Sequence, residues 1–176
     1  FAYSGLGMNP HHGNPRSPWE RDVDGSRVAG GSSSGSAVSI SDGMSAATIG
    51  SDTGGSTRAP AVYCGIVGLK PTTTRMPSDG IYPLSTSFDA AGPMGHSTDC
   101  CAVMDDIMAG GAGRAETPFP VAGLRLAIPR GYLFDELDPE VAAGFEAAVA
   151  RLSAAGAAIS DIRLDILEEL RPANRP

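Results

Sequence analysis

The chain has 176 residues, of which 41% are apolar and 19% charged, a balance typical of a folded globular domain rather than a disordered segment. Its formal net charge of −7 argues against nucleic acid or an anionic membrane as the main partner. No run approaches the roughly 20 apolar residues that a membrane-spanning helix needs. The three cysteines are odd in number, and Cys100 and Cys101 are adjacent, so a reducing compartment and a cytoplasmic location are expected.

The first half of the chain is predicted to be rich in loops. Residues 1–31 carry many Gly, Pro, Asn and His residues and predict an extended loop. Small residues over 36–49 predict a short, closely packed helix, and the apolar run 61–69 predicts a buried strand. Residues 72–93 alternate turn residues with short apolar pieces, so a second loop-rich stretch is expected there.

The second half of the chain shows clearer periodicity. Residues 99–108 predict a helix. Residues 124–128 predict a strand, and a helix with proline at its first position is expected to open at Asp138. Residues 157–164 can return as a second strand. This order is a β-α-β unit, which places the chain in the α/β class.

Two Gly-Ser turns of similar composition, at residues 30–36 and 52–58, bracket the segment predicted to form the first helix. Such turns can present two serine hydroxyls and a row of backbone N–H groups to one point. That combination suits acyl transfer, in which a hydroxyl attacks a carbonyl and an oxyanion must be held.

Three other types of site with glycine-rich turns fit the sequence less well. A phosphate-binding loop would end in Gly-Lys followed by Ser or Thr, and neither turn has that lysine. The spacing of Gly30, Gly31 and Gly35 does not match the dinucleotide fingerprint. Ser33 does sit at the centre of a Gly-x-Ser-x-Gly nucleophile elbow, but a Pro-rich loop precedes it where a strand is needed, and His96 is the one downstream histidine.

Taken together, the two turns closely resemble the amidase signature family of serine hydrolases. Ser32 and Ser56 lie 24 residues apart, and the run Gly-Leu-Lys-Pro-Thr at 68–72 also matches the family. The resemblance covers the core signature at about 1–110 and continues more loosely through the β-α-β unit at about 121–170. It implies a mixed β-sheet flanked by helices in a three-layer α/β/α arrangement. The chain would form an incomplete part of that domain over 1–176, as an internal piece of a longer enzyme.

The resemblance assigns a role to each residue of the two turns. Ser56 matches the family's nucleophile, and Ser32 matches the middle member of its Ser-Ser-Lys triad, a serine that follows a cis peptide bond. The backbone N–H groups of Thr53, Gly54, Gly55 and Ser56 match the oxyanion hole. Glycines in such a turn let the backbone approach the carbonyl oxygen of a substrate.

Supporting roles are expected for residues beside the two serines. Asp52 and Arg58 flank the nucleophile turn, and a salt bridge between them would fix the loop. Ser34 is a weaker candidate for orienting Ser32. Lys70 does not lie at the position of the triad lysine, which in the family precedes the cis serine by more than the 31 residues present here, so its expected role is structural.

The function implied by the resemblance is hydrolysis of a small carboxamide to a carboxylate and ammonia or an amine through an acyl-Ser56 intermediate. No cofactor is expected, and no metal, because His11 and His12 lack a Cys or acidic partner at ligand spacing. Without the triad lysine, the chain by itself is expected to be inactive. Two alternatives stay open: a glutaminase-type subunit of a tRNA-dependent amidotransferase, and a truncated member of the fold without catalysis. The expected partner is a small-molecule amide, with no nucleic acid or membrane, and a homodimer is compatible with the sequence.

Overall fold

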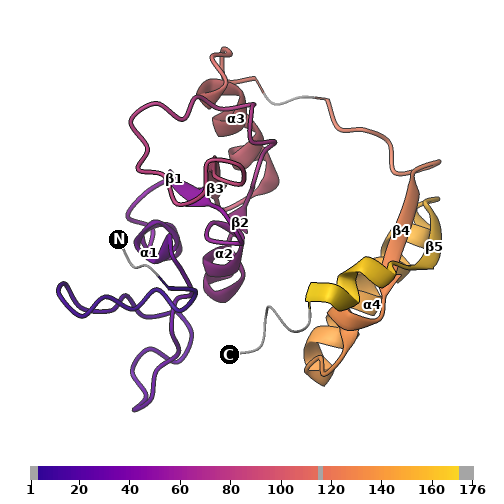
Figure 1. Ribbon diagram of the computed structural model, residues 1–176, viewed down its shortest axis with the longest axis horizontal. Helices are drawn as coiled ribbons and strands as arrows, with labels where there is room; N and C mark the ends of the chain where they lie inside the picture. The colour runs from indigo at the N-terminus through magenta and orange to yellow at the C-terminus, as the bar shows by residue number, and fades with distance from the viewer. Residues whose placement is uncertain (1–3, 115–116, 171–176) are drawn as a thin grey trace. The chain divides into compact units, whose positions relative to one another are not determined.

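The computed structural model describes residues 4–114 and 117–170, and its regular elements fall into two units that divide after residue 116 (Figure 1). Among the described residues, no helix is long and apolar enough to cross a membrane. Each unit has a sheet of its own, and helices accompany both sheets. The α/β class expected from the sequence is therefore confirmed, although the strands of this chain form two small sheets.

The first unit is built on a three-stranded antiparallel sheet in the order β1-β3-β2. Its register runs from Ala47 opposite Gly95 to Asp52 opposite Ala90, so β3 lies in the middle. The elements in chain order are α1 (Ser34–Ser41), β1 (Ala47–Asp52), α2 (Arg58–Cys64), β2 (Val67–Gly68), β3 (Ala90–Gly95) and α3 (Thr98–Met108).

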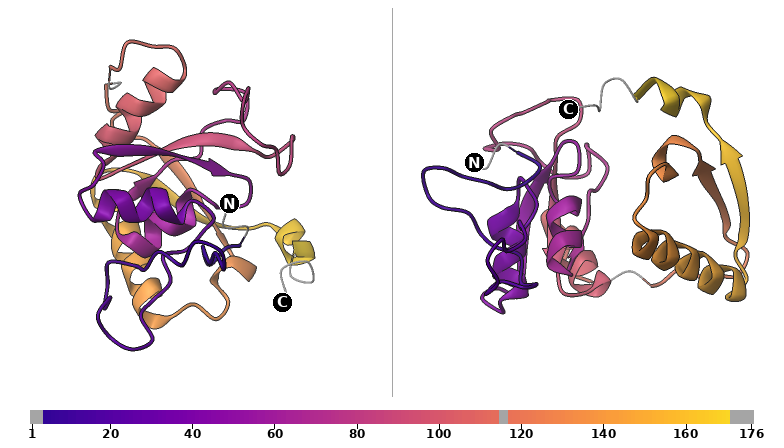
Figure 2. Two further views of the ribbon diagram at one scale, coloured as in Figure 1. Left: turned by 90° about the vertical axis from the view of Figure 1, so that its left-hand side faces the viewer. Right: turned by 90° about the horizontal axis from the view of Figure 1, so that it is seen from below.

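The helices of the first unit lie on both faces of its sheet. Figure 2 shows α1 and α2 on one side and α3 on the other. Successive residues of β3 face opposite sides of the sheet, in agreement with this arrangement. Met94 joins the buried core formed with α1 and α2, whereas a Cβ on Gly95 would lie 2.8 Å from the Cβ of Cys100 in α3. All six residues of β3 are buried, as a strand between two helical layers must be.

The second unit is a β-α-β unit whose two strands pair in parallel, from Arg125 opposite Ala158 to Arg130 opposite Arg163. The side chain of Asp138 caps its long helix by accepting a hydrogen bond from the Glu140 N–H at 2.9 Å. The β-α-β prediction is thus confirmed. The elements are β4 (Arg125–Arg130), η1 (Tyr132–Phe134), α4 (Pro139–Ala154), β5 (Ala158–Arg163) and η2 (Asp165–Leu170).

Most local predictions hold for elements with strong sequence signals. The loop expected over 1–31 is confirmed for residues 4–31, which contain a single β-bridge, while residues 1–3 lie outside the described residues. The helix expected over 99–108 is α3, and the Ser97 side chain caps it by accepting a hydrogen bond from the Cys100 N–H.

Three predictions in the first unit are wrong. The helix expected over 36–49 ends at Ser41, and β1 begins at Ala47. The strand expected over 61–69 is the end of α2 followed by the two-residue β2, because Gly65 ends the helix with a φ of 69°. The loop expected over 72–93 gives way to β3 at residue 90. Short apolar runs do not distinguish a helix from a strand, and the alanines, glycines and proline of β3 are poor strand formers.

Candidate active site

The two Gly-Ser turns meet in the folded chain. The backbone N–H of Ser33 donates a hydrogen bond to the backbone carbonyl of Ser56 at 3.0 Å. The strand β1 passes beneath both turns at Gly50, where a Cβ would lie 2.7 Å from Oγ of Ser33 and 2.8 Å from Oγ1 of Thr57. Only glycine permits so close an approach of the strand, and the approach brings the two turns together.

The peptide bond between Gly31 and Ser32 is cis, as the resemblance implied. The backbone around it is closely packed. The Gly31 N–H donates to the carbonyl of Gly5 at 2.8 Å, and a Cβ on Gly31 would lie 2.2 Å from the carbonyl oxygen of Ser4. Ser32 is therefore held by the amino-terminal loop as well as by its own turn.

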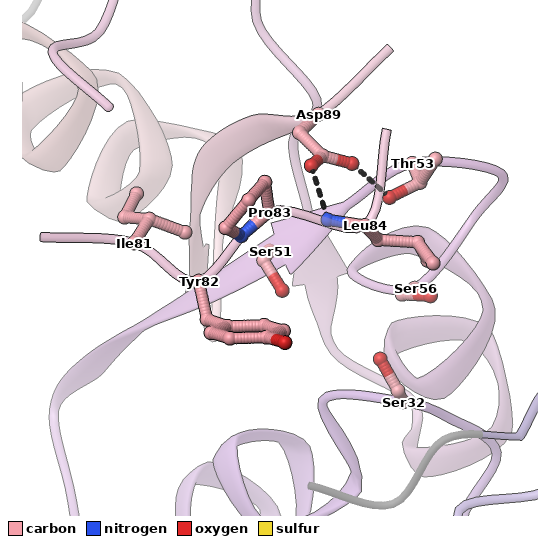
Figure 3. Close-up of a pocket in the computed structure, with 9 residues that line it drawn as sticks. All are labelled: Ser32, Ser51, Thr53, Ser56, Ile81, Tyr82, Pro83, Leu84 and Asp89. Carbon is pink, nitrogen blue, oxygen red and sulfur yellow. Dashed lines mark hydrogen bonds between the residues drawn. The ribbon is translucent and has the colours of Figure 1, made fainter. Parts of the chain in front are cut away.

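Ser32 and Ser56 line the same pocket, a hollow of about 300 Å³ (Figure 3). In the close-up, the Ser32 side chain points up toward the turn that carries Ser56. A second hollow, lined in part by Gly54, Gly55 and Ala59, adjoins this pocket and shares both serines. The pocket is lined by Ser32, Ser51, Thr53, Ser56, Ile81, Tyr82, Pro83, Leu84 and Asp89.

Backbone donors surround Ser56 in its turn. Within residues 4–114 and 117–170, the N–H groups of Thr53, Gly54 and Ser56 meet no protein acceptor. The N–H of Gly55 differs, because it donates to Oδ1 of Asp52 at 2.8 Å. Three of the four N–H groups named from the sequence are thus available to an oxyanion, and the fourth is engaged inside the turn.

Asp52 organises the nucleophile turn from the end of β1. Its side chain is fully buried, and besides the Gly55 N–H it accepts the N–H groups of Thr57 at 3.1 Å and Arg58 at 3.3 Å. The Arg58 guanidinium adds two hydrogen bonds at 3.1 Å each, so the predicted salt bridge is present. One carboxylate therefore holds the backbone on both sides of Ser56.

Burial raises the pKa of Asp52, but the hydrogen bonds from Arg58 and from the N–H groups of Thr57 and Gly55 outweigh it, and the net pKa is about 2. The group thus stays ionised at neutral pH. A buried carboxylate at this pKa is a fixed negative charge that anchors the turn, not a proton carrier for catalysis.

The lowered pKa of Asp52 predicts a defined loss of stability in acid. A carboxyl group whose pKa falls from 3.8 to about 2 on folding stabilises the fold above pH 4 and loses that contribution as the pH falls toward 2. The loss amounts to about 2 kcal/mol. Urea unfolding of the wild type and Asp52→Asn should therefore show a stability difference that shrinks by about 2 kcal/mol between pH 6 and pH 2. A difference independent of pH would contradict the assignment, and Asp79→Asn, in an exposed loop, serves as the control.

Lys70 has the structural role expected for it. Its Nζ donates hydrogen bonds to the backbone carbonyls of Asp52 and Phe88, the latter at 2.6 Å. It also lies 3.7 Å from Oδ1 of Asp52. Lys70 thereby ties the end of β1 to the segment that leads into β3.

The hydroxyl groups of two other serines considered from the sequence have hydrogen-bond partners outside the pair Ser32 and Ser56. The Ser34 hydroxyl is buried and donates to the carbonyl of Gly7 at 3.4 Å, so no contact with Ser32 supports the orienting role. The Ser33 hydroxyl donates to the carbonyl of Ser51 and does not line the pocket of Figure 3. Within the described residues, no group of three or more His, Cys, Asp and Glu side chains is placed so that it could hold a metal ion.

Sequence reasoning found only one residue of the pocket wall at 81–84. It predicts a loop there and names Tyr82 as a residue that could line an acyl pocket, and in the structure Tyr82, its neighbours and Asp89 line the pocket of the two serines (Figure 3). The segment has no helical or strand period, so periodicity could not find it. The sequence did offer one signal for this wall. Three polar residues, Ser85, Ser87 and Asp89, stand directly before the apolar residues 90–94.

Comparison with known proteins agrees with this geometry. Residues 1–174 match the family model Amidase. The chain is 43% identical over 173 residues to the 2-amino-5-chloromuconic acid deaminase of Comamonas testosteroni, and the match covers 96% of this chain and 37% of that protein. It is 36% identical over 190 residues to a glutamyl-tRNA(Gln) amidotransferase subunit of Cupriavidus necator, with 93% and 37% covered.

Solved structures give the same result. The fold matches a crystal structure of an amidase with a TM-score of 0.79 and 37% identity, covering 93% of this chain and 36% of that one. The native peptide amidase of Stenotrophomonas maltophilia matches with a TM-score of 0.75 and 30% identity, covering 92% and 36%. The chain spans little more than a third of the length of each of these relatives. On the match over residues 1–174 and the two serine turns together, this chain belongs to the amidase family.

Proposed function

We propose that this chain carries the nucleophile and the relay serine of an enzyme that hydrolyses a small carboxamide. The observation that carries the proposal is the meeting of Ser32 and Ser56 in one pocket, on turns joined by the hydrogen bond from Ser33 to Ser56. N–H groups without a protein acceptor within the described residues adjoin the same serine. A hydroxyl nucleophile beside free backbone donors is the arrangement that acyl transfer requires.

In the proposed reaction, Oγ of Ser56 attacks the carbonyl carbon of the amide and passes its proton to Oγ of Ser32. Ser32 gives its own proton to a neutral lysine. The oxyanion of the tetrahedral intermediate accepts hydrogen bonds from the N–H groups of Gly54 and Ser56, with Thr53 as a third donor. The C–N bond then breaks, and the leaving amine takes a proton back through the same relay. Water then attacks the carbonyl carbon of the acyl-Ser56 ester and gives a proton to the relay. The bond between that carbon and Oγ of Ser56 breaks, Oγ takes the proton back from the relay, and the acid product leaves as the carboxylate after losing its own proton to solvent.

The lysine of this relay is proposed to come from a segment outside residues 1–176. Lys70 is the single lysine of the sequence, and its Nζ donates to two backbone carbonyls at the end of β1 and before β3. A lysine bound in that way is not free to accept a proton from Ser32. We therefore expect amidase activity from the full-length protein and none from the 176-residue chain.

The pocket wall favours a small neutral amide beside the two serines. Ile81, Tyr82 and Leu84 contribute mainly apolar surface.

A second candidate is the glutaminase step of an amidotransferase, because the relative from Cupriavidus necator is an amidotransferase subunit at 36% identity. Hydrolysis of simple amides by the purified protein alone would favour the first candidate. A requirement for a partner subunit and tRNA would favour the second.

Free thiols at Cys64, Cys100 and Cys101 support a reducing, cytoplasmic setting.

A fluorophosphonate probe tests the proposal directly, because it reacts with an activated serine. We expect the full-length protein to be labelled at Ser56, as identified by peptide mapping, and Ser56→Ala to lose the label. Ser41→Ala removes a hydroxyl at the far end of α1 that donates to the Val38 carbonyl, and this control should label as the wild type does. Labelling at Ser33 instead would favour the nucleophile elbow, and no labelling at any serine would contradict the proposal.

A further inference from the structure

One wall of the serine pocket is held by a single carboxylate. Residues 81–84 have no helix or strand of their own. Oδ2 of Asp89 accepts the N–H of Leu84 at 2.7 Å (Figure 3). The same oxygen accepts the N–H of Ser85 at 2.9 Å. The carbonyl of Ser85 in turn accepts the N–H groups of Phe88 at 3.0 Å and Asp89 at 2.8 Å. The wall is thus a closed loop that turns around the Asp89 side chain.

The other oxygen of the same carboxylate reaches the nucleophile turn. Oδ1 of Asp89 accepts a hydrogen bond from the Thr53 hydroxyl, drawn as a dashed line in Figure 3. Thr53 directly follows Asp52 and precedes Gly54, so its backbone N–H lies within the row of candidate oxyanion donors. Asp89 therefore bridges the turn that would hold the oxyanion and the wall that would face the substrate.

The sheet brings these two residues together. Asp52 pairs with Ala90 at the end of the β1–β3 register, so Thr53 and Asp89 are the next residues outward on each strand. Lys70 donates to the carbonyls of Asp52 and Phe88 at the same junction. The hydrogen bond from Thr53, with those from Ser85 and Leu84, lowers the pKa of Asp89, so the bridge is ionised at neutral pH. Hydrogen bonds to an ionised acceptor are stronger than neutral ones.

We propose that Thr53 and Asp89 form a positioning pair that fixes the oxyanion-binding turn relative to the pocket wall at residues 81–84. Neither residue exchanges a proton with the substrate in this proposal. The pair acts through the backbone donors on one side and through the wall on the other. Its kinetic consequence rests on the proposed amidase function, and its structural consequence does not.

Two variants of the full-length protein remove the pair from either end. Thr53→Val deletes the hydroxyl at nearly constant shape, and Asp89→Ala deletes the carboxylate. Each is expected to lower kcat/KM by about 10- to 100-fold, and the double variant should be no more than about threefold worse than Asp89→Ala. Thr53→Ser keeps the hydroxyl and should stay within about threefold of the wild type. Asp79→Ala, an exposed aspartate of the same loop region, is the matched control and should leave kcat/KM unchanged.

The pattern of these results separates positioning from mere stability. A pair that only stabilised the fold would lower the melting temperature and leave kcat/KM per folded molecule at the wild-type value. That result would overturn the proposal, as would fully additive losses in the double variant, because independent residues add and coupled ones do not.

Hydrogen exchange tests the same pair without any substrate. In Asp89→Ala the amides of Leu84 and Ser85 lose their acceptor, so peptides covering 81–85 should exchange at least about tenfold faster than in the wild type. The Asp79→Ala control should show wild-type exchange there. Unchanged exchange in Asp89→Ala would overturn the proposal whatever the enzyme does. Faster exchange in a protein that hydrolyses no amide would retain the hydrogen bonds from the wall to Asp89 and reject the amidase function alone.

Discussion

Replacing Ser56 with alanine is expected to lower kcat for amide hydrolysis by the full-length protein at least about 10⁴-fold. The variant keeps the turn, its Asp52 anchor and the backbone donors, so the substrate should still bind with a similar KM. What disappears is the oxygen that forms the acyl bond. Steady-state kinetics with a chromogenic anilide would measure the loss, and mass spectrometry would show whether an acyl adduct still forms.

Ser32→Ala tests the relay in the same assay. Residues that act as one catalytic unit lose nearly the full effect when any member is removed, so Ser32→Ala and the double variant with Ser56→Ala should resemble each other closely. Ser41→Ala controls for loss of a hydroxyl outside the pocket and should retain wild-type kcat. Retention of more than about one hundredth of kcat in Ser56→Ala would reject Ser56 as the nucleophile.

Replacing Asp52 with alanine is expected to cost about 2–5 kcal/mol of folding stability, because at least two backbone N–H groups are left without an acceptor at about 1–3 kcal/mol each. The backbone N–H groups of Gly55 and Thr57 lose their acceptor, and Thr57 is fully buried, so water cannot replace it. The Arg58 side chain is about half exposed, so its guanidinium can be solvated once the partner is gone. Most of the loss therefore arises in the turn and not in the freed arginine.

The same variant should lower kcat/KM by about 100-fold under conditions in which it remains folded, because Ser56 and its neighbouring donors lose their anchor. Urea unfolding and kinetics below the melting temperature would measure the two effects separately. Asp42→Ala is the matched control, since Asp42 forms a similar pair with Arg21 at 2.7 Å but at the surface. That pair should contribute less than about 1 kcal/mol. Equal losses in the two variants would contradict the anchoring role of Asp52.

Prediction from the sequence succeeded where a local signal was complete. The second unit carried a helix start at Asp138 with Pro139, a stop at Gly156 and apolar strands on either side, and the structure has that order. The two serine turns carried a composition and spacing specific enough to indicate the family. Each of these signals is a short motif that can be read along the chain, so no knowledge of long-range packing was needed.

Prediction failed where long-range packing chose the structure. β3 consists of alanine, glycine, proline and methionine, and it is a strand because β1, β2 and the helices on both faces leave room only for small side chains. At Gly92 a Cβ would lie 2.0 Å from the Leu69 carbonyl oxygen, which shows how closely the neighbouring segment approaches. The bond between Asp89 and Thr53 joins residues 36 positions apart and leaves no periodic trace in the sequence.

The sequence alone indicated the family resemblance and the salt bridge between Asp52 and Arg58, because both depend on residue types at short spacing. Through that resemblance it predicted Ser32 and Ser56 as site residues and placed Lys70 outside the triad position. The tertiary structure decided which N–H groups are free, that Gly55 donates to Asp52, and that residues 81–84 with Asp89 form the pocket wall. Those features depend on the β1–β3 register, which places Thr53 beside Asp89. Strand pairing sets such distances between remote residues, and no local pattern records them.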